Sequence, residues 1–280
     1  MKLLRYGPVG QEKAGILTNG VIRALPNHLG DLAGQRLSRA GLAEIAALEP
    51  LLLPVVQPDV RIGACVGSVG KFICIGLNYS DHAAETGAQI PDEPVIFGKW
   101  TSAIQGPFDP VEIPRGSTKT DWEVELGIVI GKTGRHIEEA DALSHVAGYC
   151  VVHDVSERDF QFERGGTWDK GKGCDTFGPI GPYLVTPDEV PDPQTLRLWL
   201  EVDGHRYQDG TTANMIFPVA WLISYVSQFC TLNPGDIIST GTPAGVGMGQ
   251  KPQLYLKPGQ NVRLGIDGLG IQDQVMVAAQ

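Results

Sequence analysis

The amino-acid sequence predicts an α+β fold that is mainly β, on three observations. Glycine and proline supply 36 and 20 of the 280 residues, a fifth of the chain against a usual share of about an eighth, which indicates many turns. Short apolar runs of strand length outnumber helical patterns. The regular alternation of strands and helices that marks a Rossmann fold is missing from the sequence, as are the glycine-rich phosphate loops of nucleotide-binding proteins.

The first 65 residues are expected to form a small N-terminal domain. Residues 14–17 and 21–25 flank Asn19-Gly20, a strong signal for a hairpin with a two-residue turn. A helical stretch near residues 42–48 follows. We therefore predict a domain boundary at residue 65, with a larger domain over residues 66–280.

The larger domain begins with short apolar runs that predict strands. Three such strands are expected, over residues 72–76, 124–130 and 145–155, and the tract between the first two reads as loop-rich. A helix is expected to begin after Thr212, because Ile216, Ala220, Ile223 and Ser227 recur at helical spacing. Further hairpins are predicted at Asp203-Gly204 and Asp267-Gly268.

Charge and composition exclude several classes of protein. Lysine and arginine number 22 against 32 acidic residues, a net charge of −10, which argues against nucleic-acid or anionic-membrane partners. No apolar run approaches the roughly 18 residues of a membrane span, and residues 1–8 contain no apolar stretch long enough for a secretory signal. The five cysteines are scattered without a Cys-x-x-Cys pair, so we expect small buried side chains and a soluble protein of the reducing cytoplasm.

Three acidic residues carry the strongest chemical signal. Glu123 and Glu125 are two apart in a predicted strand, so their side chains project from one face. Asp154 follows the apolar run of residues 146–153. These acids can be a solvated strand face and a turn cap, or they converge, repel one another and need a cation. In the second case three oxygen ligands suit Mg²⁺ or Mn²⁺, and removing either glutamate relieves repulsion without harm to the fold.

Five sequence blocks, taken together and in order, resemble the fumarylacetoacetate hydrolase family. The resemblance covers about three quarters of the chain, from residue 71 to the C-terminus. It implies a mixed β-sandwich roll catalytic domain behind the small N-terminal domain, and a homodimer. The blocks are residues 75–82, Glu123-x-Glu125, residues 154–161, residues 171–179 around Lys172, and residues 239–247.

The resemblance also implies roles for individual residues. Glu123, Glu125 and Asp154 would bind the cation. His82, oriented by Glu85 three residues later, would remove a proton from water. Lys172 would stabilise an oxyanion. Without the family, the histidine–glutamate pair can equally lie on the surface, and the lysine can belong to a flexible basic loop.

Four further residues are expected to bind the substrate: Tyr79, Arg158, Gln161 and Thr242. Arg158 and Gln161 would share the face of Asp154 on a helical turn, where they could bind a carboxylate or ketone. Residues 240–243 form a glycine-containing turn that could cradle an anionic group. His136 and Glu138 form a rival metal motif, but a non-haem iron site needs a second histidine.

The implied reaction is metal-dependent hydrolysis of the C3–C4 bond of a 2,4-diketo acid, with pyruvate as one product and a 2,4-diketo-3-deoxy sugar acid as the expected substrate. Ureidoglycolate lyase, oxaloacetate decarboxylase and dioic-acid isomerase activities are alternatives that the resemblance leaves open. A non-catalytic metal-binding scaffold is the alternative of another class, and it has no use for a water-activating pair. The polar residues expected to recognise sugar hydroxyls are Asn78, Tyr79, Ser80, Glu85, Thr86, Gln105 and Lys119.

Overall fold

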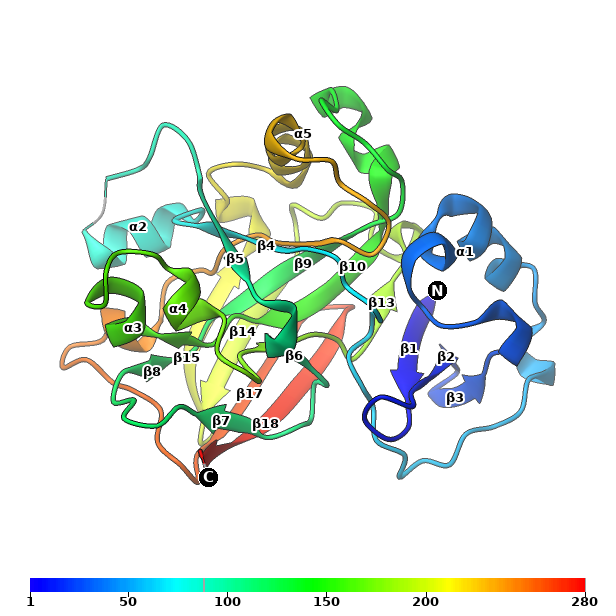
Figure 1. Ribbon diagram of the computed structural model, residues 1–280, viewed down its shortest axis with the longest axis horizontal. Helices are drawn as coiled ribbons and strands as arrows, with labels where there is room; N and C mark the ends of the chain where they lie inside the picture. The colour runs from blue at the N-terminus through cyan, green and yellow to red at the C-terminus, as the bar shows by residue number, and fades with distance from the viewer. Residues whose placement is uncertain (88, 280) are drawn as a thin grey trace.

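The fold is built on two β-sheets that pack face to face (Figure 1). The computed structural model describes residues 1–87 and 89–279. The larger sheet has nine strands in the order β3-β2-β1-β13-β10-β9-β16-β4-β5. In that order the strands are Val21–Ala24, Lys13–Thr18, Lys2–Tyr6, Leu184–Val185, Val146–His153, Val124–Ile130, Ile237–Ser239, Phe72–Gly76 and Val95–Lys99.

The second sheet has five strands in the order β15-β14-β17-β18-β7. These strands are His205–Thr211, Arg197–Val202, Asn261–Ile266, Gly270–Ala278 and Val111–Ile113. Two short pairs lie outside the sheets, β8 (Thr120–Asp121) with β11 (Ser156–Glu157) and β6 (Ile104–Gln105) with β12 (Gly178–Pro179). The mainly β, α+β prediction is confirmed.

The α-helices are short and lie around the sheets. They are α1 (Arg39–Ala46), α2 (Ser80–Thr86), α3 (Arg158–Phe162), α4 (Asp169–Lys172) and α5 (Val219–Phe229). Helices α2, α3 and α4 gather at one end of the molecule, and β1–β3 lie at the other (Figure 1). Short 3₁₀ turns connect elements at Asn27–Leu29, Gly34–Leu37, Pro50–Leu52, Thr101–Ala103, Glu139–His145, Pro187–Glu189, Thr212–Asn214 and Gly247–Gly249.

The two faces of β9 bury different side chains because strand residues alternate in direction. Val124, Leu126 and Ile128 are fully buried in the core between the two sheets, with side chains of β14 and β17. Val129 faces the other way, into a second core that the N-terminal segment covers. Glu125 has the same parity as Val129, so it lies on the face away from the sandwich core.

The N-terminal strands continue the nine-stranded sheet. Strand β1 pairs antiparallel with β13, so that Leu3 lies opposite Leu184. The hairpin predicted at Asn19-Gly20 is confirmed, since β2 and β3 pair around it. Both turn residues have positive φ, 53° and 75°, as a type I′ turn requires. The domain boundary at residue 65 stays a prediction.

Helix α5 begins at Val219, so the predicted start after Thr212 is wrong. Residues 212–214 form a 3₁₀ turn, and the backbone N–H of Ile216 donates to the carbonyl of Asn78 instead of joining a helix. Pro218 is the N-cap. A proline disfavours helical backbone at the residue before it, which delays the helix until Val219.

The tract that reads as loop-rich in the sequence contains α2 and β5. Strand β5 pairs antiparallel with β4 at the edge of the larger sheet. None of the helices in the described part of the chain has the length and apolar character needed to span a bilayer.

Candidate active site

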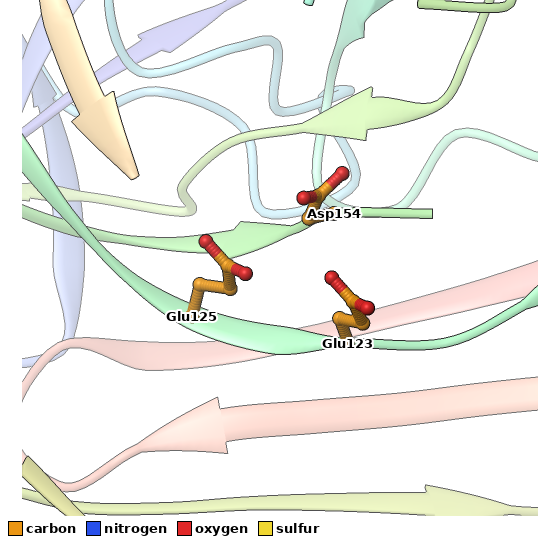
Figure 2. A group of neighbouring side chains, drawn as sticks. All are labelled: Glu123, Glu125 and Asp154. Carbon is orange, nitrogen blue, oxygen red and sulfur yellow. The ribbon is translucent and has the colours of Figure 1, made fainter. Parts of the chain in front are cut away.

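The register between β9 and β10 brings three carboxylates together (Figure 2). Val152 lies opposite Glu125, and the backbone N–H of Asp154 donates to the carbonyl of Glu123 at 3.0 Å. Residues that oppose one another across a ladder share a face, so the three acids project to the same side of the strands. One carboxylate oxygen from each lies within 4.8 Å of the others, and all three residues are buried.

Glu123 is neutralised by two cations. Lys172 Nζ donates to Glu123 Oε2 at 2.6 Å and to Asp154 Oδ2 at 2.9 Å, and Arg158 Nη2 donates to Glu123 Oε1 at 2.6 Å. Burial by itself would raise the pKa of Glu123, but the charges of Lys172 and Arg158 hold it well below its usual range. Burial would likewise lower the pKa of Lys172, and the charges of Asp154 and Glu123 raise it instead. Glu123 and Lys172 are therefore both ionised.

Glu125 has a different environment. Its Oε2 accepts hydrogen bonds from Ser239 Oγ at 2.5 Å and from the backbone N–H of Gly241 at 3.0 Å. Burial, followed by the charges of Asp154 and Glu123, raises the pKa of Glu125 well above its usual range. A further positive charge at this point would stabilise the ionised form. Three convergent oxygen donors of this kind fit a hard divalent cation such as Mg²⁺ or Mn²⁺.

A buried lysine that the sequence analysis missed supports the same cluster. Lys99, at the end of β5, has a fully buried side chain that pairs with Asp154 Oδ1. Its Nζ donates to the carbonyl of Val155 at 3.0 Å and to the carbonyl of Lys172. Lys99 thereby fixes the segments that carry Asp154 and Lys172. No sequence signal marked it, because a lysine in a presumed loop is expected to be exposed.

Replacing Lys99 by methionine is expected to lower the free energy of unfolding by about 3–5 kcal/mol, because two buried carbonyls and a buried carboxylate lose their cation. Urea unfolding of the metal-free protein measures the change. Lys119→Met is the matched control, since its ion pair with Glu163 lies on the surface and should contribute little. Equal stability of the two variants would contradict a structural role for Lys99.

His82 and Glu85 form a pair at the same site. His82 Nδ1 lies 3.4 Å from Glu85 Oε2, and both oxygens of Glu85 accept from the backbone N–H of Gly245 at 3.1 Å. Burial acts to raise the pKa of Glu85, but these hydrogen bonds lower it overall. His82 lines the cavity that Glu123, Glu125 and Lys172 also line. The pair is therefore part of the site and not a surface ion pair.

The glycine-rich segment after β16 holds carboxylates of the protein itself. The backbone N–H of Gly241 donates to Glu125, that of Gly245 to Glu85 and that of Gly247 to Asp121. In the predicted cradle of residues 240–243, Glu125 already accepts from the N–H of Gly241 and the carbonyl of Leu126 accepts from that of Thr240, so neither is left for a substrate anion. Gly245 has a φ of 108°, and a Cβ there would lie 1.9 Å from the carbonyl oxygen of Tyr207, so only glycine fits.

The four residues expected to bind substrate have different positions. Arg158, Gln161 and Thr242 line the cavity, whereas Tyr79 is fully buried in the sandwich core and is not among the lining residues. Thr242 Oγ1 donates to the carbonyl of Val124 and accepts from Gln208. Asp154 precedes α3, so the helical face that it was expected to share with Arg158 and Gln161 does not form.

Asp121 is a second residue that the sequence analysis missed. It is fully buried and accepts from Arg158 Nε at 2.9 Å and from the backbone N–H groups of Gly247 at 2.6 Å and Met248 at 2.9 Å. It thus holds Arg158, which also donates from Nη1 to Gln161 at 3.1 Å. The signal was available, since Asp121, Glu123 and Glu125 alternate along the chain.

The cavity has a volume of about 210 Å³. Its lining consists of Ile75, Gly76, Leu77, His82, Phe97, Glu123, Glu125, Arg158, Gln161, Phe162, Trp168, Lys172, Gly241, Thr242 and Met248. Of the residues expected to recognise sugar hydroxyls, Asn78, Tyr79, Ser80, Glu85, Gln105 and Lys119 are not among the described lining residues. The side chain of Thr86 lies outside the described part of the structure.

The two packed sheets thus carry a cavity lined by Glu123, Glu125, Lys172 and His82, with Asp154 and Glu85 in contact with these residues. The family signature for the fumarylacetoacetate (FAA) hydrolase C-terminal domain matches residues 71–277. The chain belongs to the fumarylacetoacetate hydrolase family, which confirms the resemblance seen in the sequence.

Individual relatives match this chain over its whole length and support the family assignment. A protein of Burkholderia multivorans that is provisionally described as a hydrolase is 67% identical over 282 residues, which cover 100% of both chains. A fumarylacetoacetate hydrolase from Exiguobacterium antarcticum is 34% identical, with a TM-score of 0.87 and 100% of both chains covered. A maleylpyruvate hydrolase from Sphingobium sp., solved with manganese(II) and pyruvate, is 30% identical, with a TM-score of 0.83 and the same coverage.

Proposed function

We propose that this chain is a divalent-metal-dependent hydrolase that cleaves the C3–C4 bond of a 2,4-diketo acid and releases pyruvate and a second acid. The observation that carries the proposal is the convergence of Glu123, Glu125, Lys172 and His82 on one cavity, with Asp154 and Glu85 in contact with them. The similar maleylpyruvate hydrolase was solved with manganese(II) and pyruvate, which supports both the metal and the product.

Glu123, Glu125 and Asp154 would hold the cation. A bound divalent cation supplies Lewis-acid stabilisation of the negative charge that develops on the 2-oxo oxygen. Arg158 contributes by holding Glu123 from the other side, at 2.6 Å. The buried side chains around the acids keep water away from this charge, which strengthens every electrostatic interaction there.

His82 acts on the attacking water. Its Nδ1 faces Glu85, so Nε2 receives the proton as the water oxygen forms a bond to C4. Glu85 stabilises the resulting imidazolium, and Gly245 fixes Glu85. The C3–C4 bond then breaks, its electron pair moves toward the 2-oxo group, and the proton held by His82 is available to C3. The water oxygen remains in the second acid, so the atoms balance.

Lys172 stabilises the oxyanion that forms at C4. Its Nζ is a buried cation that lines the cavity and stays ionised beside Glu123 and Asp154. A fixed cation in a site of low dielectric favours the transition state without reorganisation during the reaction.

The identity of the acyl tail is a narrower question. The resemblance favours a 2,4-diketo-3-deoxy sugar acid, but the described residues nominated for its hydroxyls do not line the cavity and give this substrate no support. We therefore propose the reaction for 2,4-diketo acids as a class. The homodimer and the cytoplasmic location also stay predictions.

Pyruvate release is the direct test. The purified protein is stripped with a chelator, and pyruvate is measured enzymatically with acetylpyruvate and longer 2,4-diketo acids, with and without added Mg²⁺ or Mn²⁺. Turnover is expected only after metal is restored. Activity that survives chelation would contradict the metal site. Turnover confined to oxaloacetate, ureidoglycolate or a dioic acid that isomerises would replace hydrolysis by one of the alternative reactions.

A further inference from the structure

Beyond the carboxylates, the cavity is walled by aromatic rings. Phe97 comes from β5, Phe162 from the end of α3, and Trp168 directly precedes α4. The ring centroid of Trp168 lies 5.2 Å from that of Phe97 and 5.7 Å from that of Phe162, the second pair edge to face. These distances are typical of favourable aromatic packing. We call Phe97, Phe162 and Trp168 the aromatic wall.

The aromatic wall begins beside the reacting groups and continues to the surface. Lys172 Nζ lies 5.1 Å from the ring centroid of Phe97, so this ring borders the place assigned to the C4 oxyanion. Phe97 is buried, Trp168 is half-buried and Phe162 is 46% exposed. A group attached to C4 that points away from the three acids therefore meets these rings.

Gly76 makes room for the wall. A Cβ at this position would lie 2.5 Å from Cζ3 and 2.9 Å from Cη2 of Trp168. The glycine is not needed for an unusual backbone conformation here, because its φ is not positive. The indole thus lies directly against the backbone at the end of β4, a close approach that only glycine permits.

The cationic side chains of the cavity are already paired and would bind a polar tail weakly. Within the described lining, the lysine and the arginine are Lys172 and Arg158, and both already donate to Glu123. A tail carboxylate would share these cations with the acids of the site. Of the neutral polar side chains in the lining, Gln161 accepts from Arg158, and Thr242 donates to the carbonyl of Val124 and accepts from Gln208. Tail hydroxyls at the buried end of the wall would face the rings of Phe97 and Trp168 and lose hydrogen bonds to water, which is unfavourable.

We propose that Phe97, Phe162 and Trp168 form the subsite for the C4 acyl tail, and that this tail is flat and apolar, an aryl or alkenyl group and not a polyhydroxylated or charged chain. The inference rests on the proposed function, because it takes the C1–C4 part of the ligand to lie at the acids and Lys172. It names Trp168 as the residue that determines specificity.

Binding can be measured separately from hydrolysis. In a His82→Gln background with Mn²⁺, isothermal titration calorimetry compares 4-phenyl-2,4-dioxobutanoate, 2,4-dioxopentanoate and a 5,6-dihydroxylated 2,4-dioxohexanoate. The phenyl compound is expected to bind about 10-fold more tightly than the methyl compound, as an aromatic contact provides. Adding Trp168→Ala should remove this advantage and change the affinity for the methyl compound by no more than about twofold.

Two further variants test the aromatic wall without deleting the indole of Trp168, in case Trp168→Ala fails to fold. Phe162→Ala removes a partly exposed ring and should weaken the phenyl compound selectively. Gly76→Ala should displace the indole and reproduce the effect of Trp168→Ala. Phe229→Ala, an exposed aromatic of α5, is the control and should change neither affinity.

The outcomes separate this inference from the proposed function. Equal losses for the phenyl and methyl compounds in Trp168→Ala, or tighter binding of the dihydroxy compound than of the phenyl compound, would overturn the tail subsite. Selective binding of the phenyl compound that Trp168→Ala abolishes would support it, whatever the rate of pyruvate release. Absence of pyruvate release from all three compounds by the wild-type enzyme with Mn²⁺ would overturn the hydrolase assignment alone.

Discussion

Glu125→Gln is expected to abolish metal-dependent turnover while leaving the metal-free protein at least as stable as the wild type. The variant loses one of three oxygen ligands, so cation binding should fall below detection by calorimetry with Mn²⁺. Its stability should be retained because burial and the charges of Asp154 and Glu123 already disfavour the ionised form of Glu125, so a neutral amide loses no favourable charge interaction in the metal-free protein. Pyruvate release and urea unfolding in chelator measure the two effects.

Glu123→Gln is the matched comparison. It should also abolish turnover, but Glu123 is the partner of Arg158 and Lys172. Its neutralisation leaves two buried cations undercompensated, and we expect a loss of about 3–5 kcal/mol in the free energy of unfolding. The sequence alone predicted that either glutamate could be removed without harm to the fold, and the ion pairs limit that expectation to Glu125. Equal unfolding free energies of the two variants would contradict this assignment of charges.

His82→Gln is expected to lower kcat for hydrolysis by about 10²–10⁴-fold, the usual contribution of a general base. KM should change little, because the three acids and Lys172 remain in place. Glu85→Gln should reproduce part of the loss, since Glu85 lies 3.4 Å from the imidazole and orients it. Steady-state kinetics on one 2,4-diketo acid with saturating Mn²⁺ measure these effects.

Oxaloacetate provides an internal control for His82. Its decarboxylation needs no attacking water, so any such activity should survive His82→Gln. A variant that loses both reactions equally has lost the metal site or the fold and not a base. A rise in KM with unchanged kcat would make His82 a binding residue.

Local patterns determined much of the fold and part of the site. The strands β4 and β9 begin and end where the apolar runs predicted, and the hairpin turns at Asn19-Gly20 and Asp203-Gly204 follow from residues that accept positive φ. Alternation alone placed Glu123 and Glu125 on one face. These features depend on neighbours within a few residues, so the sequence contains the information directly.

The remaining features depend on contacts between distant segments. Asp154 meets the glutamates because β9 and β10 pair in one register, and a shift of one residue would turn it to the other face. Lys99 Nζ donates to the carbonyl of Lys172, which is 73 residues away in the sequence. The ring of Trp168 packs against the backbone of Gly76. The backbone N–H groups of Gly241, Gly245 and Gly247 donate to carboxylates of the protein itself, and the local sequence does not indicate these partners. Periodicity fixes the direction of a side chain within its own element, but burial and pairing across elements decide what that side chain meets.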